Sequence, residues 1–344
     1  MRFRQSIWRG TLALFGLMLL IFSFASRPVV AQTPEWTAEP TAGWAAEATP
    51  AAVASSPLKL VWQTDFNADT ALFSPGDIAV DSLGNSYVST QGGNSVIKFD
   101  KDGKFVMKWG DNGDGNGKFH LSLGVAIDAD DNVYVTDFYN HIIQKFDSDG
   151  KFLMQWDNEP STSPAFIGID GQGNIYVNEF PPHDDHYIQK FDSWGKLVSE
   201  WSGKSGEFGG RIEDIAVDQD GNVFVADPFT NSIKKMDTNG TLVAKIGGEA
   251  SKKGNGFFYG PFGITVDSKG FVYALDGTFL QKFDSEGNFV AQWSTVGGDL
   301  DKASNVSVDS EGNIYVFAKA DVTGVNGDKV NVFLLKKFSQ SEGW

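Results

Sequence analysis

The 344-residue sequence contains no cysteine. The chain therefore has neither a disulfide framework nor a cysteine for lipid attachment. Histidine is also scarce, with four in the whole sequence. His183 and His186 have a spacing that could seat a metal, but a loop pair without a third fixed ligand is a weak zinc signal, and solvated loop histidines are the alternative. No G-x-S-x-G motif occurs, so a serine hydrolase has no visible nucleophile.

Arginine is nearly missing from most of the chain. Beyond Arg27 the only arginine is Arg211, and the formal net charge of the whole sequence is -16. Proteins that bind nucleic acid neutralise phosphates with clustered basic side chains. A chain this acidic repels phosphate instead, so we exclude nucleic acid as a partner.

The N-terminal 57 residues differ in composition from the rest of the chain. Residues 11–26 form an uncharged run that follows Arg2, Arg4 and Arg9, and residues 29–31 are small enough for signal peptidase. The run is short for a membrane span of about 20 residues, so we predict a signal peptide at residues 1–31 and a secreted or cell-envelope protein, with a retained anchor as the alternative. Residues 32–57 are rich in Ala, Thr, Pro and Glu, which predicts a disordered spacer.

Residues 58–344 are built from a repeated unit that is clearest at residues 121–156. Four short apolar runs in this unit are separated by turns rich in Asp, Asn and Gly, which predicts four antiparallel strands. An Asp ends the first run of each unit and recurs at intervals of 42 to 49 residues, a spacing that fits four strands and their connections. These marker residues are Asp81, Asp128, Asp170, Asp218, Asp267 and Asp309.

A single four-stranded sheet cannot bury both of its faces, so the six units must stack against one another. The first run of each unit has a small residue at its centre, as in Ile78-Ala79-Val80. Small residues suit a strand close to a central axis, where converging sheets leave little room. The sequence therefore predicts an all-β fold, a six-bladed β-propeller of four-stranded antiparallel blades.

The repeated pattern resembles a known family. It reads P-x-G-I-A-V-D, then G-N-x-Y-V-x-D, then N-x-x-I-x-K-F-D-x-x-G-x-F. This pattern is similar to the NHL repeat, whose family forms six-bladed β-propellers. The family often has Arg two residues after the Asn of the third segment, where this sequence has Val96, Ile142 and Ile233. A role of that Arg in relatives therefore does not transfer to this chain.

An apolar segment at residues 58–62 precedes the first complete unit. In complete units a Trp stands nine residues after the Asp of the F-D pair, as Trp109 does after Asp100. The sixth unit ends before it can supply a fourth strand, and Trp62 fills the missing position. We therefore predict that this N-terminal strand completes the last blade and closes the ring, which removes an exposed sheet edge.

Asp77, Asp214 and Asn305 stand four residues before their marker aspartates, where the first strand begins. Oxygen ligands converging on the axis could hold calcium, and lactonase-type six-bladed propellers are similar in placing a cation there. A calcium site needs six or more oxygens, however, and three such residues are visible. The alternative is that these side chains hydrogen-bond the turn that enters the strand. We expect no cofactor, with calcium as the alternative.

A second candidate set lies at the outlet of the second strand. It belongs to the loop face, which we define as the face formed by the loops between strands two and three and between strand four and the next blade. The residues of this set are Asp137, Phe138, Tyr139, Glu179, Phe180, Asp227, Phe229 and Asp276. Each acid could accept N–H bonds within its own loop. As a set, aromatic rings among negative charges predict a surface for a cationic or aromatic peptide segment.

These observations favour an exported binding scaffold that uses its loop face, because no catalytic constellation is visible. Its partner is predicted to be a protein, a peptide or a small-molecule ligand. The alternative is a metal-dependent hydrolase or lyase of the lactonase kind, with a cation at the axial cup. We expect a monomer that contacts a membrane only if the N-terminal segment is retained as an anchor.

Overall fold

The computed structural model describes residues 58–64, 74–157, 162–180, 186–202, 212–248, 255–296, 298–323 and 329–340. The predicted signal peptide and spacer, as well as His183 and Arg211, lie outside these ranges. Within them, no helix has both the length and the apolar character needed to cross a membrane.

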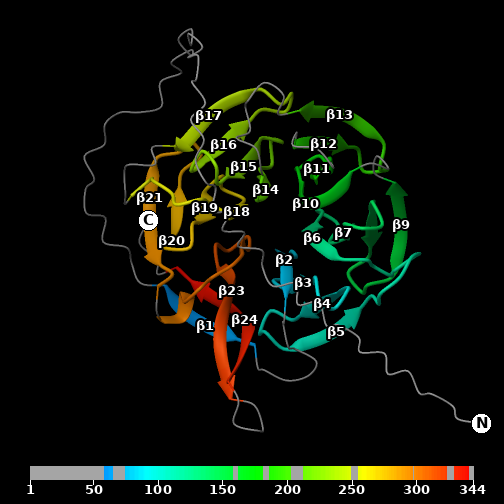
Figure 1. Ribbon diagram of the computed structural model, residues 1–344, viewed down its shortest axis with the longest axis horizontal. Helices are drawn as coiled ribbons and strands as arrows, with labels where there is room; N and C mark the ends of the chain where they lie inside the picture. The colour runs from blue at the N-terminus through cyan, green and yellow to red at the C-terminus, as the bar shows by residue number, and fades with distance from the viewer. Residues whose placement is uncertain are drawn as a thin grey trace, which may run out of the picture. The chain divides into compact units, whose positions relative to one another are not determined.

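Six antiparallel sheets of four strands each are arranged as blades around a common axis (Figure 1). This arrangement confirms the predicted six-bladed β-propeller. Blade 1 consists of β2 (Pro75–Val80), β3 (Ser86–Thr90), β4 (Ser95–Phe99) and β5 (Phe105–Trp109). Blade 2 consists of β6 (Ser122–Ile127), β7 (Val133–Asp137), β8 (Ile142–Phe146) and β9 (Phe152–Asp157). Blade 3 consists of β10 (Ser163–Ile169), β11 (Ile175–Phe180), β12 (Tyr187–Phe191) and β13 (Leu197–Ser202).

The remaining blades follow the same order, except at the last strand. Blade 4 consists of β14 (Asp214–Val217), β15 (Val223–Asp227), β16 (Ser232–Met236) and β17 (Leu242–Gly247). Blade 5 consists of β18 (Gly263–Val266), β19 (Val272–Leu275), β20 (Phe279–Phe283) and β21 (Phe289–Ser294), and a 3-10 turn, η2 (Gly298–Leu300), follows it. Blade 6 consists of β22 (Val306–Val308), β23 (Ile314–Thr323), β24 (Lys329–Ser339) and β1 (Lys59–Gln63).

Each marker Asp closes the turn between the first and second strands of its blade. In blade 1, Asp81 Oδ1 accepts the N–H groups of Leu83 and Asn85 at 3.0 and 2.8 Å. Gly84, within this turn, has a φ of 80°, a conformation that glycine adopts without steric cost. The D-x-x-G-N pattern is therefore a turn signal, and it fixes where the second strand begins.

The apolar core lies between consecutive blades. Where blades 1 and 2 meet, for example, Tyr87, Val96, Phe119 and Val133 are completely buried against one another. Outer-strand tryptophans extend this packing toward the rim. The ring of Trp109 leaves no room for a β-carbon at Gly150 of blade 2, and the pairs Trp156–Gly195 and Trp201–Gly240 repeat this contact at the next two junctions.

The N-terminal strand β1 pairs with β24 and completes blade 6, as predicted. The N–H of Thr64 also donates to the carbonyl of Leu335 at 2.9 Å. Trp62 contacts Gly103 of blade 1 as the other outer-strand tryptophans contact the blades that follow them. Segments at opposite ends of the described chain thus lie side by side in one sheet, and the ring is closed (Figure 1).

Candidate functional site

Asp77 is the third residue of β2 and Asp214 is the first residue of β14, the innermost strands of blades 1 and 4, and both side chains are buried. The Ile78 N–H donates to Asp77 Oδ1 at 2.7 Å, and the Val125 N–H of blade 2 donates to its Oδ2 at 3.1 Å. Asp214 repeats this arrangement, with donors from Ile215 at 2.8 Å and from Ile264 of blade 5 at 2.9 Å. Each carboxylate therefore links the first strand of its own blade to that of the next.

Asn305 makes the corresponding link between blades 6 and 1. Its Oδ1 accepts the Val306 N–H at 2.6 Å, and its Nδ2 donates to Asp77 Oδ1 at 3.1 Å. Of the three residues predicted from the sequence as an axial set, Asp77 and Asn305 are thus linked by a hydrogen bond. Asp77 and Asp214 both line one axial cavity of about 160 Å³, whose remaining lining consists mostly of first-strand Val, Ile and Ala side chains.

Burial changes the acidity of both axial carboxyl groups. Loss of hydration raises the pKa of Asp77 from 3.8 to about 6, although three hydrogen bonds act in the opposite direction. The pKa of Asp214 is raised well above its usual value, first by burial and then by the negative charge of Asp77. The two groups thus influence each other across the axis, and protonation of one favours ionisation of the other.

The axial residues do not fit a calcium site as they stand. Calcium requires six to eight oxygen ligands. All four carboxylate oxygens of Asp77 and Asp214 already accept backbone N–H groups, and the Asn305 amide nitrogen occupies the space beside Asp77 Oδ1. Across the described part of the chain, no group of three His, Asp or Glu side chains is placed to hold a metal ion. Hydrogen bonding between blades is the role that this geometry shows.

The four acids predicted at the loop face occur at the strand outlets, but their side chains lie below the surface. Asp137, Glu179 and Asp227 are completely buried, and Asp276 is 5% exposed. Asp137 accepts the His120 N–H at 2.8 Å, and burial raises its pKa. These acids therefore offer little accessible oxygen to a partner, in contrast to the aromatic residues beside them.

Hydrogen bonds show what these buried acids do. Asp276 Oδ1 accepts the N–H groups of Thr278 and Phe279 at 2.9 and 2.8 Å. Asp227 pairs with the buried ammonium of Lys234 at 2.8 Å and accepts the Thr230 N–H at 3.0 Å. The acids therefore order the loops that carry the aromatic side chains.

Aromatic side chains from blades 2 and 3 form a continuous run on the loop face. Phe138 contacts Tyr139 and Phe180 edge to face, with ring centres 5.1 and 5.8 Å apart. Phe180 in turn contacts His186 at 4.7 Å. We call these four residues the aromatic run. Tyr139 is 62% exposed, and Phe229 of blade 4 is a separate exposed ring on the same face.

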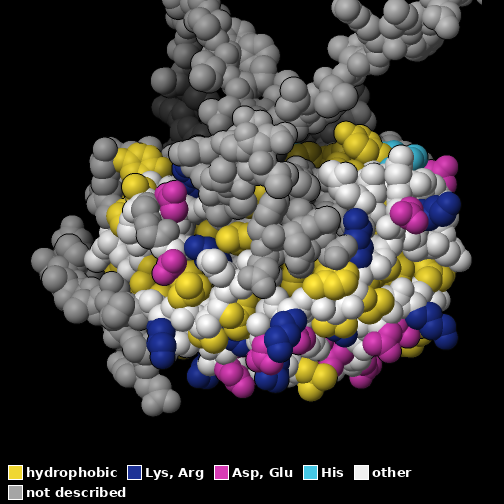
Figure 2. All heavy atoms as spheres, turned by 90° about the horizontal axis from the view of Figure 1, so that it is seen from below, with side chains coloured by type: hydrophobic (Ala, Val, Ile, Leu, Met, Phe, Trp, Pro, Cys, Tyr) yellow, Lys and Arg dark blue, Asp and Glu magenta, His cyan; other side chains and the backbone are white. Residues whose placement is uncertain are grey.

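His186 is the member of the aromatic run that sequence reasoning assigned instead to solvent. The sequence signal that could have placed His186 there is a Phe at the end of a strand together with a His after the loop that follows. His141, another loop-face histidine, has Nδ1 2.5 Å from the carbonyl oxygen of Thr162 and so joins neighbouring loops. In the edge-on view of Figure 2, histidine and hydrophobic side chains meet at the upper edge, whereas charged side chains gather along the lower edge.

Solved structures of several enzymes are similar to this chain. Virginiamycin B lyase from Staphylococcus aureus aligns with a TM-score of 0.53 and 15% identity, over 82% of this chain and 99% of the lyase. A gluconolactonase from Xanthomonas campestris aligns with a TM-score of 0.56 and 15% identity, over 83% and 98% of the two chains. A luciferin-regenerating enzyme aligns with a TM-score of 0.59 and 11% identity, over 83% of this chain and 96% of that enzyme. At these identities the likeness shows the fold alone.

Comparisons of the sequence alone match a much smaller part of the chain. No curated protein matches the sequence. The NHL repeat matches residues 123–146, which run from β6 to the end of β8 in blade 2. Blades 1, 3, 4 and 5 repeat the strand order of this blade, and blade 6 does so up to its outer strand, which is β1. The chain thus contains an NHL-repeat match in blade 2 and folds as a six-bladed β-propeller, the fold that the resemblance to the NHL repeat implies.

Proposed function

We propose that this propeller is a binding scaffold that captures a polypeptide segment on its loop face. The observation that carries the proposal is the aromatic run, in which Phe138 holds Tyr139 and Phe180 in fixed edge-to-face contact. Rings that are already ordered lose little conformational entropy on binding, and aromatic side chains are frequent anchors of protein interfaces. The buried acids beneath them keep the loops in place.

The partner's chemistry follows from the charge of the chain. With a formal net charge of -16, the protein attracts a basic segment and repels an acidic one. Aromatic ring faces also interact favourably with the cationic groups of Lys and Arg. We therefore assign as partner a segment that combines basic with aromatic or other apolar residues.

The predicted signal peptide at residues 1–31 adds a location to this proposal. An exported scaffold would meet its partner outside the cytoplasm, and the Ala/Thr/Pro-rich spacer at residues 32–57 would hold the propeller away from the envelope.

Selection from a random peptide library tests the proposal. We expect the selected peptides to be enriched in basic and aromatic residues. Phe138→Ala should weaken a selected peptide about tenfold or more, because loss of an interface anchor costs about 1 to 3 kcal/mol. Trp194→Ala is the matched control, because Trp194 is 78% exposed but lies in a turn on the opposite face. Equal weakening by both substitutions, or by neither, would place binding elsewhere.

A metal-dependent hydrolase or lyase at the axial mouth is the alternative function. Its support is the fold shared with the lyase and the gluconolactonase. We prefer the scaffold because the oxygens of Asp77 and Asp214 already accept backbone N–H groups. A rise in melting temperature on addition of calcium, lost in Asp214→Ala, would favour the enzyme instead.

A further inference from the structure

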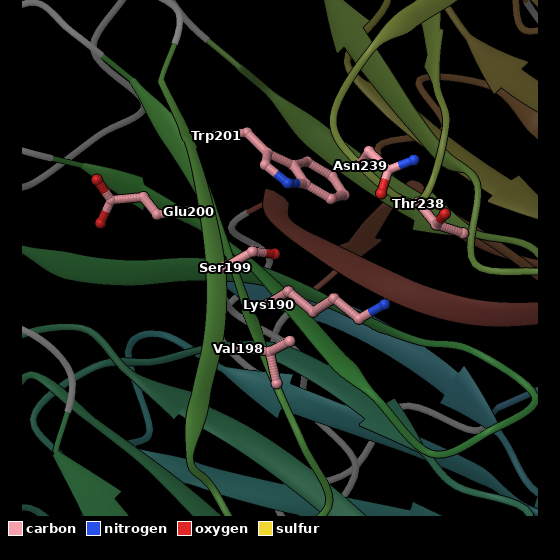
Figure 3. Close-up of a pocket in the computed structure, with 7 residues that line it drawn as sticks. All are labelled: Lys190, Val198, Ser199, Glu200, Trp201, Thr238 and Asn239. Atoms are coloured by element: carbon pink, nitrogen blue, oxygen red, sulfur yellow. The ribbon is translucent and has the colours of Figure 1, made fainter.

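A pocket opens on the rim of the propeller between blades 3 and 4, away from the loop face. Its volume is about 430 Å³, within the range of small-molecule sites. One wall is the outer strand β13 together with Lys190 of β12, and the other is the turn between β16 and β17 (Figure 3). We call it the rim pocket, and it is lined by Lys190, Val198, Ser199, Glu200, Trp201, Thr238 and Asn239.

One position of the repeat explains why this groove is open. Ser199 stands opposite Lys190 in the pairing of β12 with β13. At the same position, blades 1 and 2 have Met107 opposite Lys98 and Met154 opposite Lys145. A serine in place of the long methionine side chain leaves space beside the lysine. In blades 4 and 5 the position holds an alanine, and there the alanine is itself buried.

The lysine at this site also differs from its equivalents. Lys98 Nζ donates to the carbonyl of Ser148 at 2.8 Å, and Lys145 Nζ lies 3.2 Å from a carboxylate oxygen of Asp128. Lys282 donates to Gln340 Oε1 at 3.0 Å. Among the described residues, Lys190 instead makes neither a hydrogen bond nor an ion pair through its ammonium, which lies 4.9 Å from the centre of the Tyr176 ring.

The marker carboxylate of this blade is engaged by other donors, since Asp170 Oδ2 accepts the Asn174 amide at 2.7 Å and the Tyr176 hydroxyl at 3.1 Å. Asn239 occupies the turn position that holds Asp102, Asp149 and Glu286 in blades 1, 2 and 5, so this position carries no negative charge. The carboxylate that the facing turn does contain, Asp237, accepts the N–H groups of Asn239 and Thr241 at 2.9 Å. Glu200 lines the pocket edge, but its Oε2 accepts the Gln189 amide at 3.0 Å, and its side chain points away from Lys190 and Trp201 (Figure 3).

The apolar wall of the pocket is rigid. The Trp201 indole is 8% exposed and packs on the Tyr176 ring with centres 5.7 Å apart. Gly240 of blade 4 lies against the same indole and has no room for a β-carbon. Val198 lines the pocket beside it. The rim pocket thus places a small apolar surface, formed by Val198 and the exposed part of the Trp201 indole, next to a cation and the Ser199 hydroxyl.

We propose that the rim pocket binds small carboxylates that carry a flat apolar or aromatic group. The Lys190 ammonium and the Ser199 hydroxyl bind the carboxylate, since hydrogen bonds to charged groups are the strong ones. Trp201 and Val198 contact the apolar group. An anion site in a chain with a formal net charge of -16 depends on this local arrangement, because the protein as a whole repels anions.

Phenylacetate is a suitable probe, and its neutral analogue phenylacetamide is the control. We expect phenylacetate to shift the indole N–H resonance of Trp201 saturably in the full chain, with a Kd on the order of 1 mM, since a fragment-sized ligand has few contacts. The resonance is assigned by its loss in Trp201→Phe. No saturable shift, or an equal affinity for phenylacetamide, would overturn the proposal.

Substitutions taken from the other blades locate the site. Lys190→Met should weaken phenylacetate about tenfold, through loss of a charged hydrogen bond, and Ser199→Met should abolish binding by filling the pocket as Met154 does in blade 2. Lys145→Met, at the equivalent position of blade 2, should leave the Kd unchanged. The melting temperature of each variant separates loss of binding from loss of folding. Binding that survives in folded Ser199→Met would overturn the assignment.

Discussion

At the scale of single residues, burial makes the ionisation of Asp77 a part of the stability of the propeller. The same side chain links β2 to β6 through the Val125 N–H and β2 to blade 6 through Asn305. Its charged form is favoured by these hydrogen bonds and disfavoured by loss of water, and the second effect is the larger. Asp77 therefore binds a proton more tightly in the folded than in the unfolded chain.

This difference predicts a pH dependence with a definite sign. Because the folded-state pKa is raised from 3.8 to about 6, the contribution of Asp77 to stability is fully present below about pH 4 and is lost as the pH rises through 6. Relative to Asp77→Asn, the wild type should lose about 2 kcal/mol of unfolding free energy between pH 4 and pH 7. Denaturant unfolding at intermediate pH values measures this. A constant difference across the range would show that Asp77 has an ordinary acidity.

At the scale of secondary-structure elements, ring closure depends on β1. Every other outer strand follows its neighbour through a tight turn, whereas β1 joins β24 from a distant part of the chain. Without it, β24 would present an unpaired edge, and Gly103 would lose its contact with Trp62. The strand is five residues long, yet it completes both a sheet and a blade junction.

We expect removal of this strand to destabilise the whole propeller. A chain lacking residues 1–64 should unfold with a free energy lower by about 3 to 5 kcal/mol, because a large buried side chain and a strand pairing are lost together. A chain lacking residues 1–57 is the matched control, since it keeps β1 and removes the segment before it. Thermal unfolding of the two chains, followed by circular dichroism, measures the difference. Equal melting temperatures would contradict the closing role of β1.

The elements could be predicted from sequence because the turn chemistry repeats. The marker Asp and its glycine define the first turn of most blades, and the period gives the number of blades. The register of β1 could not be predicted in the same way. Trp62 pairs with Lys337. The residue of blade 6 that is equivalent to the partner of Trp109 in blade 1 is Leu335, so the register of β1 differs from that of β5. No turn fixes the register of this strand, so side-chain packing determines it.

The candidate sites were less accessible to sequence reasoning. Phe138, Tyr139 and Phe180 could be placed on the loop face from their distance to the marker Asp. The burial of Asp137 and Asp227 could not, because it depends on the His120 N–H of another loop and on the Lys234 ammonium of the neighbouring strand. The rim pocket is the space that a short side chain in one blade leaves against the next blade. It can be found only once the blades are stacked in the structure.

At the scale of the whole molecule, closure and charge together determine self-association. The six outer strands that remain as sheet edges have five or six residues each, and short edges are poor templates for strand addition. The formal net charge of -16 adds repulsion between copies. The aromatic run and the rim pocket lie on different surfaces, so a partner at one leaves the other accessible.

We therefore expect the protein to be monomeric at micromolar concentration. Light scattering coupled to size-exclusion chromatography should give the mass of a single chain, at low and at moderate salt. A dimer that appears only at high salt would mean that charge repulsion alone keeps the copies apart. A dimer at all salt concentrations would contradict the expectation.

The pairing of β1 with β24 has a further consequence for how the chain is connected. Lys59 lies opposite Ser339, so the two ends of the described propeller meet in neighbouring antiparallel strands. A short covalent linker between them would convert this junction into an ordinary hairpin, like those of the other five blades. New termini could then be opened at another outer hairpin without altering any strand neighbour. The fold is in this sense circularly permutable, and its topology has no obligatory starting blade.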